Sequence, residues 1–370
     1  MANLYIIISA FVSAVILGRI IIPNILIISL RKRLFDVPDE RKVHKRPIPR
    51  LGGVTFFPVI LFSLCVFTAV RLMTGHGPAD TSTTDLVCEF LFLTGGLTLL
   101  YIVGIADDLI GVRYRKKFLV QIISAAMFPL SGLYINNFYG LFGIYLIPAE
   151  VGIPLTMLLV VFITNAINLI DGIDGLASGL SMVALLVFGV LFVHFRMWSY
   201  AMLAFVTVGV IIPFFSYNVF GSADLGRKIF MGDTGSLTLG YILSFFVIKY
   251  CMYEPDMLLT MKTSPVLVSF SVLMVPCLDV IRVVLRRARN KRSLFMPDKT
   301  HIHHKFLAMG FSPQRALVTI QLMSACFCAF TIVAILYMNN TLVFVIDVVV
   351  WTLLNLWFDH VINRKAKNGE

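Results

Sequence analysis

Charged residues are scarce in this 370-residue chain: they make up 14% of the sequence, whereas hydrophobic residues make up 58%. Soluble domains have about 25% charged and about 45–50% apolar residues. The mean hydropathy of +0.89 departs from that class in the same direction. The shortage of charge therefore excludes a soluble globular protein and indicates a membrane protein.

The sequence also lacks a soluble insertion, a Gly/Ser linker and a low-complexity tract, so we predict one integral-membrane domain over 1–370. Its motifs fall within about 1–340, and a last helix and basic tail follow over 341–370. The six cysteines have no metal-ligand spacing and are interpreted as small apolar side chains. The basic residues are dispersed among short loops, so no nucleic-acid partner is expected.

Long apolar runs take up most of the chain. A bilayer-spanning helix needs roughly 20 such residues. We therefore predict an all-α, polytopic protein with about eleven transmembrane helices. The predicted spans are 3–30, 53–73, 88–106, 118–135, 152–170, 178–195, 199–219, 236–250, 265–285, 316–337 and 341–360.

Arginine and lysine are nearly missing from one side of this predicted bundle. With the N-terminus outside, 26 of the 31 fall on the inner side and four on the outer side. Basic residues concentrate in cytoplasmic loops. The sequence thus predicts an outer N-terminus and a cytoplasmic C-terminus. Attraction to anionic membrane lipid and a polyanionic substrate both fit the net charge of +11.

Four polar motifs stand at the predicted inner ends of the spans, where ionisable groups at membrane depth indicate function. The first is the pair Asp107-Asp108, which precedes Lys117. Adjacent helical residues point about 100° apart. One carboxylate could face a ligand and the other a cation, or the pair could simply be a neutralised helix end.

The second motif carries polar residues in steps of three, which keeps them along one helical ridge. Two glycines after it allow the chain to turn and to approach a ligand closely. A helix cap would explain one amide and one glycine, but not this whole set. The motif comprises Asn165, Asn168, Asp171, Gly172, Ile173, Asp174 and Gly175.

The third motif surrounds Asp233, between two glycines and beside Thr234. Asp233 could cap the next helix or bind Mg²⁺, which prefers carboxylate, amide and phosphate oxygens. Phe230, three residues earlier, could be an interfacial aromatic or a stacking surface for a base.

The fourth motif contains three of the seven histidines: His301, His303 and His304. Zinc is an alternative, because imidazole binds it well, but no cysteine or fixed fourth ligand lies nearby. A solvated loop is a second alternative. Hydrogen bonding and charge neutralisation of phosphates, beside Lys299 and Lys305, is the favoured interpretation. The loop 41–53, with Pro-Ile-Pro and Gly-Gly, suggests a rigid turn that holds Lys45 at the site.

Together, in order, spacing and side, these motifs resemble the polyprenyl-phosphate N-acetylglucosamine-1-phosphate transferases, a branch of the superfamily that includes the phospho-MurNAc-pentapeptide translocase. The His-Ile-His-His run is similar to the GlcNAc-1-phosphate branch rather than to the continuous His-His-His of the translocases. One departure is Leu-Ile-Gly after Asp107-Asp108, where no third acidic residue follows.

The resemblance implies roles for the matched positions. Asn168 and Asp233 would bind Mg²⁺, or Mn²⁺ in its place. The implied catalytic residues are Asp107, Asp108, Asp171, His301, His303 and His304. The implied substrate-binding residues are Lys45, Lys117, Gly172, Ile173, Asp174 and Phe230.

The resemblance also implies transfer of N-acetylhexosamine 1-phosphate, with GlcNAc favoured, from a UDP-sugar to undecaprenyl phosphate. UMP would leave, on the cytoplasmic face of a bacterial inner membrane. Phosphoryl transfer depends chiefly on positioning and charge neutralisation, which these residue types supply. The alternative is a transporter or flippase for an anionic nucleotide-sugar or lipid-linked substrate. The sugar, the single or double displacement route and a homodimer are left open.

Overall fold

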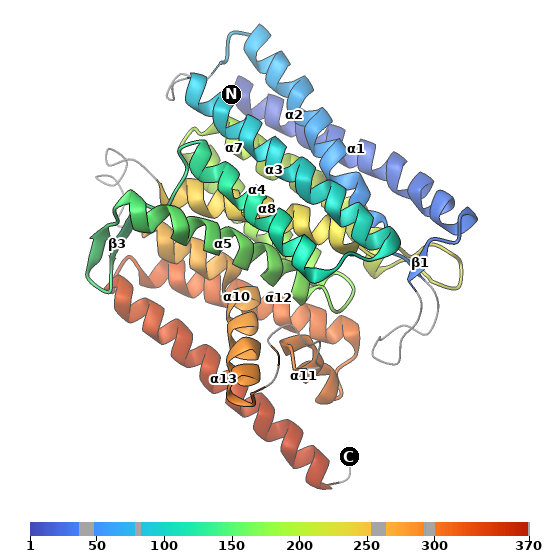
Figure 1. Cartoon of the computed structure of the whole chain (residues 1–370), viewed down its shortest axis with the longest axis vertical. Helices are drawn as coiled ribbons and strands as arrows, with labels where there is room; N and C mark the ends of the chain where they lie inside the picture. The colour runs from blue at the N-terminus through green and yellow to red at the C-terminus, as the bar shows by residue number, and fades with distance from the viewer. Residues whose placement is uncertain (37–47, 78–82, 253–263, 292, 294–299, 369–370) are drawn as a thin grey trace.

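The computed structural model describes residues 1–36, 48–77, 83–252, 264–291, 293 and 300–368. Within these ranges the chain forms a bundle of long helices (Figure 1). They are α1 (Ala2–Arg31), α2 (Phe56–Met73), α3 (Thr83–Ile110), α4 (Tyr114–Leu130), α5 (Ala149–Ile170), α6 (Leu176–His194), α7 (Trp198–Val219), α8 (Gly232–Cys251), α10 (Pro265–Arg289), α12 (Pro313–Ala334) and α13 (Asn340–Asn368).

The remaining elements are short. They are the helix α11 (Ile302–Ala308), the 3₁₀ turn η1 (Gly52–Thr55) and two hairpins, β1 (Phe35–Asp36) with β2 (Ile48–Pro49) and β3 (Asn137–Leu141) with β4 (Ile144–Leu146). Both hairpins are antiparallel. The predicted all-α membrane class is confirmed, with these two small additions.

Ten helices of the described residues are long and apolar enough to cross a bilayer. The predicted fourth span, 118–135, corresponds to the 17-residue α4, which begins four residues earlier and ends five earlier. Its end follows from Gly132, whose φ of +87° ends the helix. The earlier start places Lys117 on the first helical turn. At 1.5 Å per residue α4 is about 25 Å long, slightly less than a bilayer core of about 30 Å.

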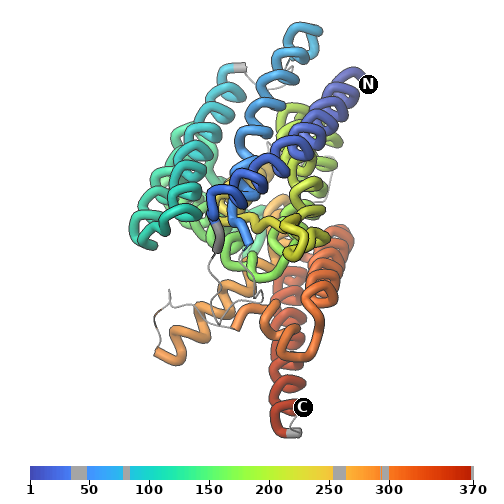
Figure 2. Tube along the Cα trace, turned by 90° about the vertical axis from the view of Figure 1, so that its right-hand side faces the viewer, coloured from blue at the N-terminus to red at the C-terminus, as the bar shows by residue number. Residues whose placement is uncertain are grey.

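The two termini lie at opposite ends of the molecule (Figures 1 and 2). The predicted last span, 341–360, was too short, because α13 continues through the basic tail to Asn368. Lysines near the C-terminus of a helix interact favourably with its dipole, which supports this extension.

Helix α8 lies at the centre of the bundle and is almost entirely buried. Small residues let its neighbours approach closely, as in other membrane helix pairs. A methyl group on Gly104 of α3 would lie 2.6 Å from Thr234 Cα, and one on Gly240 of α8 would lie 2.7 Å from Thr164 Cα of α5. The contact at Gly104 fixes the C-terminal end of α3, which carries Asp107 and Asp108, against the start of α8.

A second fixed point lies at the opposite end of the same helices. Glu89 of α3 accepts hydrogen bonds from Tyr200 of α7 at 2.5 Å and Lys249 of α8 at 2.7 Å. Lys249 also lies over the Tyr200 ring, 4.9 Å from its centroid. A buried ion pair of this kind needs such additional partners to offset its desolvation.

Helix α13 is attached near both ends. At its start, Asn340 donates to the Tyr139 carbonyl at 2.8 Å, and Thr341 accepts from the Phe142 amide at 2.8 Å. Near its other end, Lys305 of α11 forms an ion pair with Asp359 at 2.9 Å and donates to the Asn355 side chain at 3.1 Å. The last helix therefore supports the segment that carries the histidines.

We expect Gly104→Ala to destabilise the protein, because its methyl group would force α3 and α8 apart. Overpacking typically costs about 1–3 kcal/mol. Thermal unfolding of purified protein in detergent measures the effect. Gly95→Ala is the matched control, since Gly95 lies on the same helix with nothing within 4 Å of a methyl group. Equal unfolding temperatures for the two variants would contradict the close α3–α8 packing.

Candidate active site

Three charged side chains meet where α3 ends and where α4 and α8 begin. The Lys117 ammonium nitrogen lies 3.3 Å from an oxygen of Asp107 and also forms an ion pair with Asp233. The other Asp107 oxygen accepts from the Val112 amide at 2.7 Å. A turn at Gly111, with φ of +72°, folds α4 back beside α3 and brings Lys117 to the carboxylates.

Asp108 holds the start of α8. Its carboxylate accepts from the Asp233 amide at 2.8 Å, the Thr234 amide at 3.0 Å and the Thr234 hydroxyl at 2.6 Å. A carboxylate at a helix N-terminus satisfies unpaired amides and interacts favourably with the helix dipole. Gly232, with φ of +72°, leaves no room for a side chain between Arg50 and Asp108. Asp108 therefore positions Asp233.

The polar ridge of α5 divides into two parts. Asn168 donates to the Ser236 hydroxyl at 2.8 Å and interacts with Asp233. Asn165 instead pairs with Gln121 of α4, donating at 2.6 Å and accepting at 3.3 Å. Only the inner part of the ridge faces the charged cluster, so Asn165 serves helix packing.

The donor set at this cluster fits a hard divalent cation. Mg²⁺ typically takes one or two protein carboxylates and completes its coordination with water and substrate phosphate. Asp233 supplies a carboxylate and Asn168 an amide oxygen, and the Lys117 ammonium already occupies a cation position between Asp107 and Asp233. Within the described ranges no group of three or more His, Cys, Asp or Glu side chains has the arrangement of a metal site.

The loop between α5 and α6 forms the second wall of the site. Burial, followed by the carboxyl groups of Asp174, Asp233 and Asp108, raises the pKa of Asp171 to about 8. Asp174 forms an ion pair with Lys228 at 2.6 Å. Asp171 and Asp174 thus differ in environment: one lies among carboxyls and the other beside a cation.

Phe230 lies on the segment that faces this loop. Asn218 of α7 joins the two segments, accepting from the Gly175 amide at 2.6 Å and donating to the Ile229 carbonyl at 2.9 Å. Phe230 in turn pairs with the chain before η1: its amide donates to the Pro49 carbonyl at 2.8 Å, and its carbonyl accepts from the Gly52 amide at 2.9 Å. The predicted pocket residues Gly172, Ile173, Asp174 and Phe230 are therefore brought together.

The histidines enter the site from α11. Asp279 of α10 accepts from the Ile302 amide at 3.0 Å, pairs with His301 Nδ1 at 2.8 Å, and binds Arg282 at 2.7 Å. The rings of His301 and His303 are nearly parallel, with centroids 5.9 Å apart. His304 follows, 4.3 Å from His303.

His303 connects this helix to the α5–α6 loop. Its Nε2 would collide with a methyl group on Gly172, so only glycine allows this approach. Burial, followed by His304 and His301, lowers the pKa of His303 to about 3. This ring is therefore neutral near pH 7, where it can hydrogen-bond but adds no positive charge, unlike the charge neutralisation expected from the sequence.

Several contributors were not among the predicted site residues. Asp279, Asn218 and Lys228 orient the histidines, the loop and Asp174, respectively. For Asp279 a signal was present: an isolated carboxylate in an apolar span, three residues before an arginine. Lys45 lies outside the described residues, so its predicted role stays a prediction.

Comparison with known proteins points to one family. The sequence model of glycosyl transferase family 4 matches residues 90–251, which run from α3 to α8. A probable undecaprenyl-phosphate N-acetylglucosaminyl 1-phosphate transferase of Bacillus subtilis is 31% identical, over 92% of this chain and 89% of the relative.

Two further relatives extend the similarity to other bacteria. An undecaprenyl-phosphate alpha-N-acetylglucosaminyl 1-phosphate transferase of Yersinia pestis is 29% identical, over 80% of this chain and 76% of its own. A decaprenyl-phosphate N-acetylglucosaminephosphotransferase of Mycolicibacterium smegmatis is 31% identical, over 80% and 74%.

We expect Asp279→Asn to lower turnover by about 10- to 100-fold, the usual cost of losing the partner that orients a functional histidine. The amide can accept only at one atom, so His301 loses its orientation. Asp347→Asn is the control, because Asp347 is also a fully buried carboxylate but lies on α13 beside Thr331. The two variants are compared by their initial rates, measured on protein that has been shown to be folded. A similar fall in both variants would show a general packing effect instead.

Proposed function

The chain belongs to glycosyl transferase family 4, and on that premise we propose that it transfers N-acetylglucosamine 1-phosphate from UDP-N-acetylglucosamine to undecaprenyl phosphate, releasing UMP. The observation that carries this proposal is the meeting of Asp107, Lys117 and Asp233. The α5–α6 loop joins this cluster to the histidines, since Asp171 feels the charge of Asp233 and Gly172 lies against His303. The names of the relatives support the acceptor and the sugar.

The donor half of the proposal rests on the α5–α6 loop and the Phe230 segment, which Asn218 and the Asp174–Lys228 ion pair hold together. We propose that Phe230 stacks on uracil while Ile173 and Asp174 line the pocket, with Lys228 fixing the Asp174 carboxylate at 2.6 Å. Aromatic faces bind nucleobases by stacking. Neutral His303 and its neighbours would hydrogen-bond the diphosphate and sugar from the opposite wall.

A magnesium ion would be held by Asp233 and Asn168, where it would supply charge stabilisation to the diphosphate of the donor. Asp108 would keep Asp233 in place through the two amide hydrogen bonds at the start of α8. Lys117 would contribute a fixed cation to the phosphate oxygens.

We propose direct attack by the lipid phosphate on the β-phosphate of the donor. The lipid phosphate already has an anionic oxygen nucleophile, so a covalent enzyme intermediate adds little. Asp107 would orient or deprotonate the acceptor. Both of its oxygens have donors, Val112 N at 2.7 Å and Lys117 at 3.3 Å, which supports an orienting group.

We place the site on the cytoplasmic face of the bacterial inner membrane. This face is open to the cytoplasm, where UDP-sugars are made. The Lys and Arg asymmetry of the sequence supports this orientation. The family match and the gathering of the motif residues at one end favour an enzyme over the transporter that the sequence left open.

We expect Asp233→Asn to lose at least about 10²-fold in rate, because a neutral amide would bind Mg²⁺ more weakly and the developing phosphate charge would lose that stabilisation. Transfer should also require Mg²⁺ or Mn²⁺. The transfer of label from UDP-GlcNAc to undecaprenyl phosphate by the purified enzyme measures both effects. Asp224→Asn, an exposed carboxylate nine residues earlier, is the control. Full activity in EDTA would remove the metal from the mechanism.

For the chemical route, we expect no exchange of labelled UMP into UDP-GlcNAc by lipid-depleted enzyme, and rapid exchange once undecaprenyl phosphate is added. Direct displacement requires both substrates in one complex. Exchange without lipid would instead reveal a phospho-sugar enzyme. Asp107→Asn, tested in parallel, should abolish the lipid-dependent exchange.

A further inference from the structure

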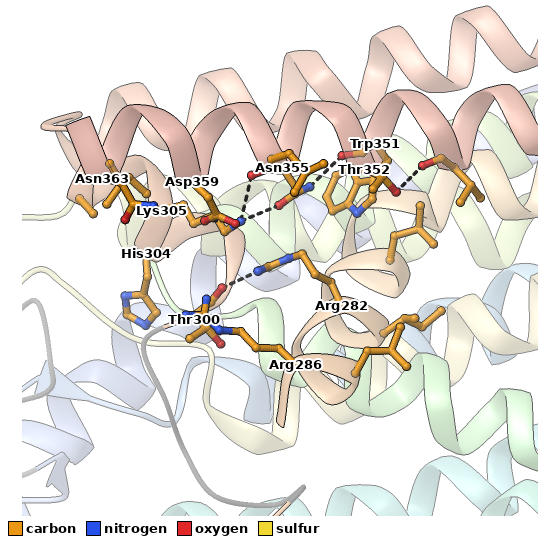
Figure 3. A pocket seen from close by; sticks show the side chains of 17 residues that line it. Arg282, Arg286, Thr300, His304, Lys305, Trp351, Thr352, Asn355, Asp359 and Asn363 are labelled. Carbon is orange, nitrogen blue, oxygen red and sulfur yellow. Dashed lines mark hydrogen bonds and ion pairs between the residues drawn. The ribbon is translucent and has the colours of Figure 1, made fainter. Parts of the chain in front are cut away.

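A groove separates the inner half of α10 from α13. It encloses about 700 Å³, within the range of small-molecule sites. Its walls are largely apolar, formed by Leu278, Ile281 and Leu285 of α10 and by Val348 and Trp351 of α13. Helix α11 closes one end with His304 and Lys305 (Figure 3). Both α10 and α13 are long and apolar enough to span a membrane, and the groove lies toward the ends of these helices that carry Arg286 and Asn363.

The groove contains polar atoms without partners among the described residues. Trp351 is 3% exposed, yet its indole N–H donates to none of them, and it points into the groove (Figure 3). The Nε of Arg282 is also buried without a partner there. Buried tryptophan N–H groups usually find an acceptor. These two donors indicate that oxygen atoms of a ligand belong in this space.

Among the described residues that line the groove, one cation lacks an acidic partner. Lys305 is paired with Asp359 at 2.9 Å, and Arg282 with Asp279 at 2.7 Å. Arg286, one turn after Arg282, is exposed and has no acidic partner in the described part of the chain. An apolar groove with donors and a cation at its inner end fits an amphipathic anion.

We propose that this groove is a site for an anionic glycerophospholipid of the bilayer. Its phosphate would lie beside Arg286, its ester oxygens near Trp351 and Arg282, and one acyl chain along the apolar wall. Basic pockets between membrane helices on the cytoplasmic side bind anionic headgroups. This site goes beyond the proposed transfer reaction, because the lipid is a resident and not a substrate.

The position of the groove favours a resident lipid over the reacting one. Asp107, Lys117, Asn168 and Asp233 do not line it, and of the predicted site residues that the structure describes only His304 does. His303, by contrast, lies against Gly172 on the side of the α5–α6 loop. A lipid in the groove would bridge α10 and α13 and hold α11 between them, so the site would couple membrane composition to the position of the histidines.

Quenching of Trp351 fluorescence by brominated lipids tests the proposal. The Trp198→Phe/Trp357→Phe variant retains Trp351 as the sole tryptophan. We expect brominated phosphatidylglycerol, diluted into phosphatidylcholine bilayers, to quench roughly fivefold more effectively than brominated phosphatidylcholine, the effect of about one cation. Adding Arg286→Gln should abolish the preference, whereas Arg289→Gln, on the same helix but outside the groove, should retain it.

Two outcomes would overturn the proposal. One is equal quenching by the two lipids, or a preference that survives Arg286→Gln. The other is relief of quenching by near-stoichiometric undecaprenyl phosphate together with a raised KM for that acceptor in Arg286→Gln, which would assign the groove to the substrate. Because the readout is fluorescence, it is independent of whether the transfer reaction itself is as proposed.

Discussion

The carboxylate of Asp108 at the N-terminus of α8 is the interaction on which the site depends. Helix α8 is almost wholly buried, so the unpaired amides of its first turn have little access to water. Asp108 satisfies two of them, and in doing so fixes α3 against α8. Asp107, the next residue along the chain, is thereby placed beside Asp233, and Lys117 can reach both.

This arrangement explains why the reactive groups lie at helix ends. Each of α3, α5 and α8 contributes an end, where the backbone turns and polar atoms are not all committed to the helix. Glycines make the approach possible: Gly104 lets α3 contact α8, and Gly172 admits His303. A side chain at either position would therefore separate groups that the chemistry needs together.

Much of this could be predicted from the sequence, because long apolar runs specify spans and ionisable residues at their ends are expensive without a function. The contacts between motifs could not. Asn165 and Asn168 look equivalent along one ridge, yet one pairs with Gln121 and the other reaches Ser236, since only packing decides which neighbour each face meets. Likewise the neutrality of His303 follows from its burial, which no spacing reveals.

The attachments of α13 have a consequence for handling the protein. The helix continues to Asn368, two residues from the C-terminus, and its Lys365 donates to the Met309 carbonyl at the end of α11. A purification tag or fluorescent fusion placed close behind Lys365 would therefore lie beside the contact that holds the end of α11. The N-terminus lies at the far end of the bundle, so a label there leaves this support undisturbed.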